Sequence, residues 1–181
     1  FLNCFNKMGV NAQKANDVRT IKRSSHLILP GVGHFSRAMS MLRNAQFIST
    51  LEHMVFQNGV PLLGVCVGMQ MLLEKSYEFG EHEGLGLFEG YVSKLNVPEH
   101  AVPFIGWKKV NVLERENQFY FVHSYHAQPV HGDDIFCSYT LGTERIVAAV
   151  RRDNVIGVQF HPDKSQEQGL KVLANFVVWQ P

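Results

Sequence analysis

The pattern of apolar and polar positions changes character near the middle of the chain. In the first half, short apolar runs such as residues 27–29 and 61–65 are separated by segments whose apolar residues recur at helical spacing. Such runs are typical of buried strands. From about residue 90 onward, apolar and polar positions alternate, which indicates strands. Together the two halves predict an α/β fold with a mixed sheet, in which antiparallel hairpins are added to a parallel core.

The same pattern gives approximate bounds for the elements. Residues 76–87 are rich in glycine and acidic residues and are expected to form a loop, and residues 151–154 are expected to form a hairpin turn. We expect helices over residues 2–8, 35–51 (interrupted at 43–44), 54–58 and 166–177. We expect strands over residues 26–29, 61–65, 91–95, 106–113, 119–124, 135–139, 146–150 and 155–160, with a further short candidate at 10–14.

Residues 61–73 combine a strand, a sharp turn and the start of a helix that we expect to continue to about Glu74. The turn contains Gly64-x-Cys66-x-Gly68, a cysteine version of the nucleophile elbow. A sharp turn crowds the backbone, so residues without a Cβ are needed on either side. The turn also places Cys66 at a helix N-terminus, which favours the thiolate. The alternative is an ordinary core cysteine, and the choice depends on finding a base elsewhere.

A candidate base follows the last expected strand. His161 and Asp163 lie at a strand end, just before a terminal helix for which Ser165 is a plausible N-cap. His161 would accept the thiol proton of Cys66 and return it to a leaving group, and Asp163 would orient the imidazole. One alternative is a histidine without a functional role, since the chain has nine. Metal binding is a weaker alternative, because no third ligand falls at a convincing spacing.

Acyl-transfer chemistry also needs N–H donors that stabilise an oxyanion. Val67 directly follows the candidate nucleophile and is one possible donor. A glycine of Pro30-Gly31-Val32-Gly33, a loop after an apolar run, is the other. The same Pro-Gly pair is equally compatible with a plain turn.

Composition narrows the class of function. The chain of 181 residues is long enough for one domain with a substantial core, and its net charge of +1 gives no indication of a nucleic-acid partner. Three widely separated cysteines suggest neither a disulfide framework nor a zinc site, which favours a reducing compartment. No apolar run reaches membrane-spanning length and no signal peptide is visible, so we expect a cytoplasmic protein with no membrane partner. Because the chain starts at Phe1 directly in a helical pattern, we also expect upstream residues to be missing.

The motifs, taken together and in order, resemble those of class I (triad-type) glutamine amidotransferases. The resemblance covers nearly the whole chain and is closest to the glutaminase subunits of imidazole glycerol phosphate synthases. Three features separate those subunits from relatives that serve other synthases: the Gly-Met-Gln after the elbow (residues 68–70), the Gly106-Trp107 pair and the segment Lys164-Ser165-Gln166. The motifs that carry the resemblance are residues 30–33 (PGVG), 64–70 (GVCVGMQ), 121–125 (FVHSY) and 159–165 (QFHPDKS).

The resemblance implies a fold and an activity. It implies an open, mostly parallel mixed sheet flanked by helices, with residues 1–181 forming a single glutamine amidotransferase domain that lacks its first strand. The implied reaction is hydrolysis of glutamine to glutamate, with ammonia channelled to a (β/α)₈-barrel synthase subunit in a heterodimer. That partner would make imidazole glycerol phosphate and an aminoimidazole carboxamide ribotide in histidine biosynthesis. No cofactor and no metal are implied.

The resemblance also implies roles for individual residues. The catalytic triad is Cys66, His161 and Asp163. Gly33 and Val67 match the oxyanion hole. The positions that match substrate-binding and interface residues are Gln70, Glu78, Ser124 and Tyr125 for glutamine, and Trp107 for the synthase partner. Apart from the resemblance, Glu78 could be a solvated surface acid, and residues 124–125 could be an ordinary strand end.

Departures from the family pattern affect the site and the interface. Val67 stands where relatives commonly have leucine, and Asp163 replaces the more usual glutamate, which keeps the charge but shortens its reach. Phe104 and Lys108 stand where histidine and asparagine are common. In relatives the segment around these two residues lies at the synthase interface, so the identity of the partner stays open.

Three other functions remain compatible with these residues. The same glutaminase chemistry could feed another synthase, such as one that amidates a surface sugar. A catalytically silent binding subunit could keep the fold, although the intact triad residues argue against it. A stand-alone cysteine hydrolase of the same superfamily is the remaining alternative.

Overall fold

A five-stranded mixed sheet forms the centre of the computed structural model, which describes residues 1–112 and 116–181. Three parallel strands lie side by side at one edge, β1 (Leu27–Gly31), β2 (Leu62–Cys66) and β11 (Val155–Val158). The sheet continues with β10 (Glu144–Arg152), antiparallel to β11, and β9 (Ile135–Leu141), antiparallel to β10. This arrangement confirms the predicted α/β class, with a parallel core and an antiparallel hairpin extension.

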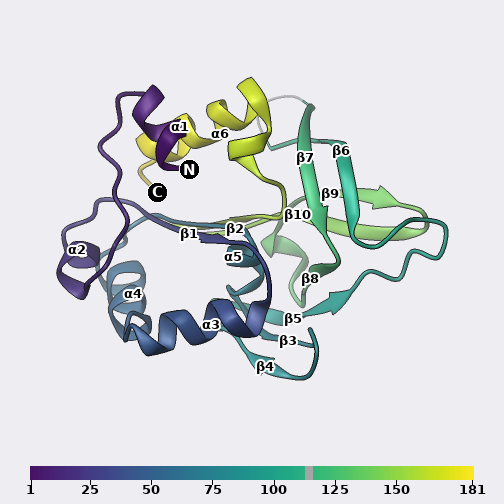
Figure 1. Cartoon of the computed structure of the whole chain (residues 1–181), viewed down its shortest axis with the longest axis horizontal. Coiled ribbons are helices and arrows are strands. Elements are labelled where there is room, and N and C mark those ends of the chain that lie inside the picture. The colour runs from purple at the N-terminus through teal and green to yellow at the C-terminus, as the bar shows by residue number, and fades with distance from the viewer. Residues whose placement is uncertain (113–115) are drawn as a thin grey trace.

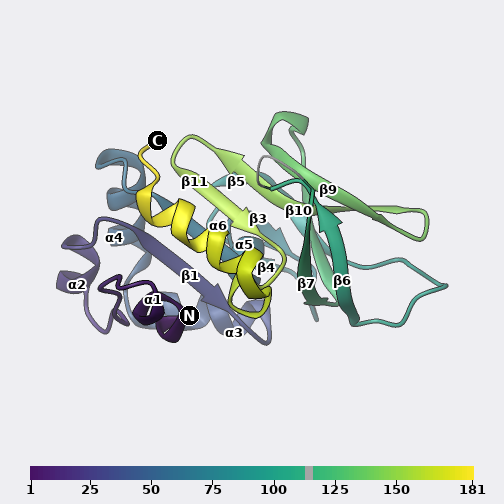
Figure 2. The ribbon, with the colours of Figure 1, turned by 90° about the horizontal axis from the view of Figure 1, so that it is seen from above.

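Helices flank both faces of this sheet, as Figure 1 shows. Helices α1 and α6 lie on one face, and α2, α3 and α4 lie on the other. The view from above places α6 obliquely across the parallel strands (Figure 2). The helices are α1 (Leu2–Lys7), α2 (Val18–Lys22), α3 (Phe35–Asn44), α4 (Ile48–Glu52), α5 (Val67–Gln70) and α6 (Gln166–Val178), with a π-helical segment at His53–Gln57 and 3₁₀ turns at Gly132–Asp134 and Pro162–Lys164.

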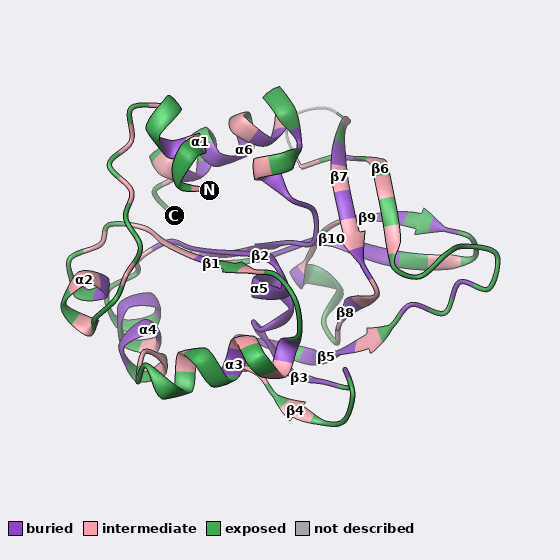
Figure 3. Cartoon of the chain, viewed as in Figure 1, coloured by how far each residue is buried: buried purple, intermediate pink, exposed green. Residues whose placement is uncertain are grey.

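Burial follows directly from this layering. Every residue of β2 is buried, because helices cover both faces of the strand, and its sequence Leu-Leu-Gly-Val-Cys is correspondingly apolar (Figure 3). Strand β5 (Phe88–Lys94) begins by alternating between buried and exposed positions, as expected for a strand with one covered face. The candidate nucleophile therefore ends the most deeply buried strand of the core.

The antiparallel additions do not all join the central sheet. A separate four-stranded sheet contains β4 (His82–Glu83), β3 (Leu73–Ser76), β5 and β8 (Tyr125–Pro129), in that order. A third sheet pairs β6 (Phe104–Val110) with β7 (Asn117–His123). Aromatic packing connects this pair to the central sheet, since the rings of Phe119 and Phe160 stack with centroids 4.2 Å apart.

Several expected elements differ from the structure. The helix predicted to reach Glu74 is wrong, because α5 ends at Gln70 and Leu73–Ser76 forms β3. The backbone carbonyls that a longer helix would use are taken by another segment: Met71 O accepts from Leu85 N–H and Leu72 O accepts from Phe88 N–H. Residues 10–14 form no strand in the described chain, and the end of the expected strand 106–113 lies outside the described residues.

Other expectations agree with the structure in place, if not always in detail. The predicted interruption at residues 43–44 falls where α3 ends. The hairpin turn at 151–154 joins β10 to β11. Ser165 is the N-cap residue of α6, but its hydroxyl makes no capping hydrogen bond and serves another purpose, described below. No helix in the described ranges combines the length and apolarity that a membrane crossing requires.

Candidate active site

Cys66 occupies a strained turn between β2 and α5. Its backbone has φ +55° and ψ −112°, a conformation that costs a non-glycine residue about 1–3 kcal/mol. The side chain is buried, with 5% of the residue surface exposed. Strain of this kind persists only where the surrounding structure enforces it, and strained residues cluster at functional sites. The geometry therefore agrees with the nucleophile elbow that the sequence predicts.

The glycines around Cys66 are needed for close backbone packing. A Cβ on Gly68 would lie 1.8 Å from the carbonyl oxygen of Leu29 in β1. A Cβ on Gly64 would lie 2.7 Å from the carbonyl oxygen of Gly68, and one on Gly31 would lie 2.5 Å from the amide nitrogen of Gly68. The first turn of α5 is thus pressed against the end of β1, which explains the Gly-x-Cys-x-Gly pattern in steric terms.

His161 follows β11 and is fixed by its backbone to β7. Its N–H donates to Tyr120 O at 2.9 Å. The Ser165 hydroxyl donates to His161 O at 2.6 Å and accepts from Tyr120 N–H at 2.9 Å. Three hydrogen bonds therefore link His161, Tyr120 and Ser165, and they fix the backbone of the candidate base. A Cβ on Gly169 would lie 1.8 Å from Pro162 O, so α6 also packs directly on this loop.

The side chains of His161 and Asp163 form an ion pair. His161 Nδ1 lies 3.8 Å from Asp163 Oδ1, and the His161 side chain is 3% exposed. Burial opposes protonation of the imidazole, but Asp163 and Cys66 outweigh it and raise the pKa of His161 to about 9. Burial likewise opposes ionisation of Asp163, yet His161 holds the pKa of that carboxyl below its usual range. At neutral pH the pair is imidazolium and carboxylate.

Cys66 lies in a buried network of amides that sequence reasoning did not identify. Gln159 Nε2 lies 3.7 Å from Cys66 Sγ, and Val122 O lies 3.8 Å from the same sulfur. Gln70 Nε2 donates to Gln159 Oε1 at 3.0 Å and to Tyr125 O at 2.9 Å. The only sequence signal for Gln159 was its place in the motif that contains His161, with no role attached to it.

His123 completes this network as a neutral imidazole. Burial, and after it the charges of His126 and His161, lower the pKa of His123 to about 4, against an opposing hydrogen bond to Tyr125 O. Because Tyr125 O can only accept, His123 Nδ1 is the donor, at 2.9 Å. His123 Nε2 then accepts from the Tyr139 hydroxyl at 3.0 Å. Both lone pairs of Tyr125 O are therefore engaged, by His123 and by Gln70.

The candidate oxyanion residues lie in different surroundings. Val67 is buried at the start of α5 and packs against the end of β1, since a Cβ on Gly31 would lie 2.7 Å from Val67 Cβ. Gly33 is exposed, with φ +89°, in the loop between β1 and α3. Gly31, the last residue of β1, is thus the glycine that packs against the elbow, and the role of Gly33 as an oxyanion donor stays a prediction.

The predicted substrate residues converge on the same edge of the molecule. Glu78 is 9% exposed, and one carboxylate oxygen accepts from Phe35 N–H at the start of α3 at 2.6 Å. Its other oxygen lies 3.5 Å from His34 Nδ1. Glu78 is therefore not the solvated surface acid considered as an alternative. Gln70 has both amide hydrogens engaged, so it can meet a substrate only through Oε1.

Ser124 and Tyr125 lie at the junction of β7 and β8. The carbonyl of Ser124 accepts from Leu95 N–H at 2.9 Å. The ring of Tyr125 lies 6.3 Å from that of Phe79, whose side chain is largely exposed. The structure thus brings this junction next to the loop that carries Glu78, as a shared substrate site requires.

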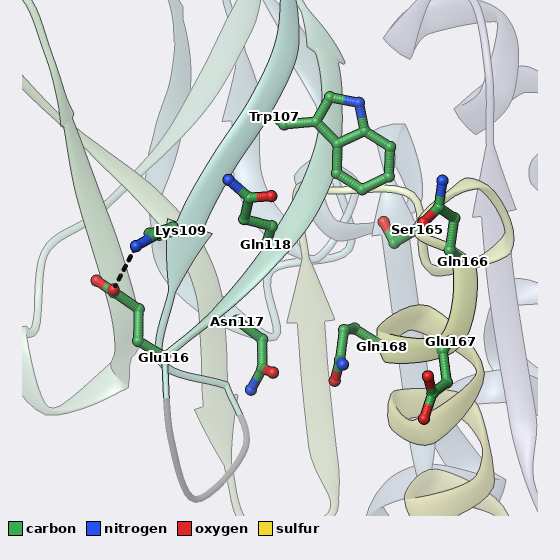
Figure 4. Close-up of a pocket in the computed structure, with 9 residues that line it drawn as sticks. All are labelled: Trp107, Lys109, Glu116, Asn117, Gln118, Ser165, Gln166, Glu167 and Gln168. Carbon is green, nitrogen blue, oxygen red and sulfur yellow. Dashed lines mark ion pairs between the residues drawn. The ribbon is translucent and has the colours of Figure 1, made fainter.

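Trp107 lines a polar cleft beside the loop that carries His161. The cleft has a volume of about 350 Å³ and lies between the β6–β7 hairpin and the start of α6. Figure 4 shows Trp107 and Gln118 on the hairpin side and Ser165, Gln166 and Gln168 on the side of α6. Trp107 is 42% exposed, and its indole meets the ring of Tyr120 edge-on with centroids 5.7 Å apart.

The family model of class-I glutamine amidotransferases matches residues 5–179. The protein named imidazole glycerol phosphate synthase subunit HisH from Aquifex aeolicus is 42% identical over 171 residues, which cover 90% of this chain and 81% of that protein. The protein of the same name from Sulfurimonas denitrificans is 39% identical over 190 residues, which cover 98% of this chain and 91% of that protein.

A solved structure supports the fold independently. A crystal structure described as a glutamine amidotransferase superposes with a TM-score of 0.77, covering 96% of this chain and 89% of that one. Its sequence identity is 17%, so this likeness bears on the fold alone.

Proposed function

This chain belongs to the class-I glutamine amidotransferase family, and we propose that it is the glutaminase subunit of an imidazole glycerol phosphate synthase in histidine biosynthesis. Residues 1–181 would act as one glutamine amidotransferase domain, with Cys66, His161 and Asp163 as its triad. The single observation that carries the triad is the position of Cys66 in a strained elbow beside an imidazole whose pKa is raised to about 9. A protonated His161 next to the sulfur favours the thiolate form of Cys66.

The reaction follows from these positions. The Cys66 thiolate attacks the side-chain amide carbonyl of glutamine, and a C–S bond forms as the carbonyl electrons move to oxygen. When the tetrahedral intermediate collapses, the C–N bond breaks and His161 donates its proton to the departing nitrogen, which leaves as ammonia. Water then attacks the γ-glutamyl thioester with His161 as the base. Glutamate leaves and Cys66 is restored, so one glutamine and one water give one glutamate and one ammonia.

The developing oxyanion needs donors on the elbow side of Cys66. In this proposal the N–H of Val67 is the first donor, because it directly follows the nucleophile at the start of α5. The N–H of Gly33 is the second. The loop of Gly33 continues from Gly31, which already packs against Val67 and Gly68.

Glutamine would be held by groups of complementary chemistry. The Glu78 carboxylate is suited to the α-ammonium group, and Gln70 Oε1 is a further acceptor for the same end of the substrate. The backbone at Ser124 and Tyr125 would meet the rest of the amino-acid end. The proximity of the Tyr125 and Phe79 rings supports this placement, because it joins the β7–β8 junction to the loop of Glu78.

The ammonia would pass to a (β/α)₈-barrel synthase subunit. Ammonia must be kept from water, because protonation removes its nucleophilicity. We place the partner on the face with Trp107, where the exposed indole and the polar cleft lie beside the His161 loop. The name shared by the relatives favours a histidine-pathway partner over a sugar-amidating one.

The test is glutamate release from glutamine by the full-length protein, alone and with the histidine-pathway barrel and its ribonucleotide. We expect strong stimulation by the barrel and loss of activity in Cys66→Ala. Glutamate release that Cys66→Ala leaves intact would contradict the triad. Activity that is lost in Cys66→Ala but indifferent to the barrel would contradict only the choice of partner.

A further inference from the structure

Within the described part of the chain, one side-chain amide lies within contact distance of the Cys66 sulfur, and the orientation of that amide is fixed by its neighbours. Gln159 is fully buried and its Nε2 lies 3.7 Å from Cys66 Sγ. Oxygen and nitrogen of a glutamine amide are distinguished by the hydrogen bonds that each makes. The question of which atom faces the sulfur is therefore decided by the chain of contacts behind Gln159.

That chain starts at a group that can only accept. Tyr125 O is a backbone carbonyl, so the Gln70 atom 2.9 Å from it must be the amide nitrogen. The second hydrogen of the same nitrogen points to Gln159 at 3.0 Å, and the Gln159 atom that receives it must be the oxygen. The remaining end of the Gln159 amide, which faces Cys66, is therefore the N–H donor. Gln70 is 3% exposed, so water competes little for these bonds.

A second contact of the sulfur, to a backbone carbonyl, makes a donor on this side favourable. Val122 O lies 3.8 Å from Sγ and can accept a hydrogen bond from the neutral thiol. Towards a thiolate, the same carbonyl oxygen is repulsive, because both carry negative charge. The N–H of Gln159 is favourable to the thiolate, and it counteracts the carbonyl in the state that attacks the substrate.

We propose that Gln159 is a further catalytic residue of the glutaminase reaction, whose amide N–H stabilises the sulfur anion of Cys66. Gln70 and Tyr125 are positioning residues that orient this amide. Gln70 thus has a second role besides the proposed contact with glutamine, since one of its N–H groups donates to Tyr125 O and the other to Gln159 Oε1, while its own oxygen stays available. This proposal rests on the proposed function of Cys66 as the nucleophile.

The test measures the nucleophilicity of Cys66 without the substrate. The full-length protein is treated with iodoacetamide over a range of pH, and modification of the peptide that contains Cys66 is followed by mass spectrometry. In Gln159→Met, which keeps the length of the side chain but has no donor, we expect modification at neutral pH to slow by about ten- to a hundredfold, the value of a hydrogen bond to a charged group. The pH profile of modification moves to higher pH. Glutamate release with the barrel partner falls by a similar factor, with a smaller change in KM.

Matched variants separate this role from a structural one. Gln159→Glu presents a carboxylate to the sulfur and is expected to slow modification at least as much, so the proposal stays testable if one variant folds poorly. Gln128→Glu makes the same chemical change at a partly buried glutamine whose amide donates to Ser93 Oγ, and its profile should match that of the unmodified sequence. A folded Gln159→Met protein with an unchanged pH profile would overturn the proposal. In that case Cys66→Ala decides separately whether the triad itself stands.

Discussion

Asp163 Oδ1 lies 3.8 Å from His161 Nδ1, which is an ion-pair distance but longer than a hydrogen bond. An aspartate carboxylate lies one methylene group closer to its own backbone than a glutamate carboxylate would, which limits how near it comes to the imidazole. The pair is sheltered, with the His161 side chain 3% exposed and that of Asp163 21% exposed. The carboxylate therefore acts mainly through its charge, and its distance from the imidazole can be adjusted by substitution.

Asp163→Glu adds one methylene group and should bring the carboxylate within hydrogen-bond distance of His161. We expect glutaminase kcat to be kept or raised. Asp163→Asn keeps the shape but removes the charge, and kcat should fall by about three to four orders of magnitude, as in other triads. Steady-state glutamate release in the presence of the partner measures both. Equal activity in Asp163→Asn and the parent would contradict the role of Asp163.

The pH dependence follows from the raised pKa of His161. In the proposed mechanism the imidazolium donates the proton to the leaving nitrogen, so kcat/KM should fall as pH rises through about 9. The charged pair also stabilises the fold, and this contribution is complete below pH 6.5 and lost as pH rises through about 9. In Asp163→Asn the pKa of His161 is lower, so the alkaline limb should move to lower pH. If the alkaline fall in kcat/KM keeps its position in Asp163→Asn, it reports the titration of a group other than His161.

Glu78 combines a structural contact with a predicted substrate contact, and one substitution separates them. In the parent protein Phe35 N–H donates to Glu78 Oε2 at 2.6 Å. Glu78→Gln keeps an oxygen that can accept this hydrogen bond but removes the negative charge. We expect KM for glutamine to rise by about tenfold or more, as for loss of a charge-assisted bond, with little change in the urea midpoint. Glu78→Ala removes both contacts and should lower stability as well. An unchanged KM in Glu78→Gln would show that the carboxylate only accepts the hydrogen bond at the start of α3 and does not bind glutamine.

The elbow could be predicted from the sequence because its constraint is local. A Cβ on Gly64 or Gly68 would clash with backbone atoms, so the requirement appears directly as two glycines around Cys66. His161 was also recognisable, since it lies in a motif at a strand end. The parallel core followed from the apolar runs at β1 and β2, and in β2 every residue is buried, which leaves an unbroken apolar sequence.

The rest depends on contacts between distant segments. The orientation of Gln159 is set by Gln70 and by the carbonyl of Tyr125, and no local pattern records that arrangement. The end of α5 was missed for a similar reason, because the carbonyls of Met71 and Leu72 are claimed by residues 85 and 88. The apolar spacing after Cys66 is helical, but tertiary hydrogen bonds override it.

Gly68→Ala tests the steric basis of the elbow. The added Cβ would lie 1.8 Å from Leu29 O, a backbone atom that moves only if β1 or α5 moves. We expect a loss of unfolding free energy of about 3 kcal/mol or more, at the upper end for overpacking. Gly132→Ala is the control, since a Cβ there meets no atom within 4 Å. Urea unfolding of the full-length proteins measures both, and similar midpoints would contradict the packing argument.

Arg152 and Asp134 form another ion pair with a buried carboxylate. It tests whether burial determines how much an ion pair contributes to the free energy of unfolding. Arg152 Nε donates to Asp134 Oδ1 at 2.8 Å and Nη2 donates to Oδ2, while the Asp134 side chain is 5% exposed. Arg152→Met leaves the carboxylate buried without its cation. Because the Arg152 side chain is itself 41% exposed, we expect a loss of about 2 kcal/mol, below the range for fully buried pairs.

The matched control for Arg152→Met is Lys171→Met on the surface of α6. Lys171 Nζ lies 2.8 Å from Glu167 Oε1, but the two side chains are 47% and 76% exposed. Water solvates the remaining carboxylate, so this variant should lose no more than about 0.5 kcal/mol. Urea unfolding at neutral pH compares the two. If both variants lose the same amount, burial of Asp134 does not determine the strength of its pair. If Arg152→Met alone is destabilised and Asp134→Asn in addition restores part of the loss, the unpaired buried charge is the cause.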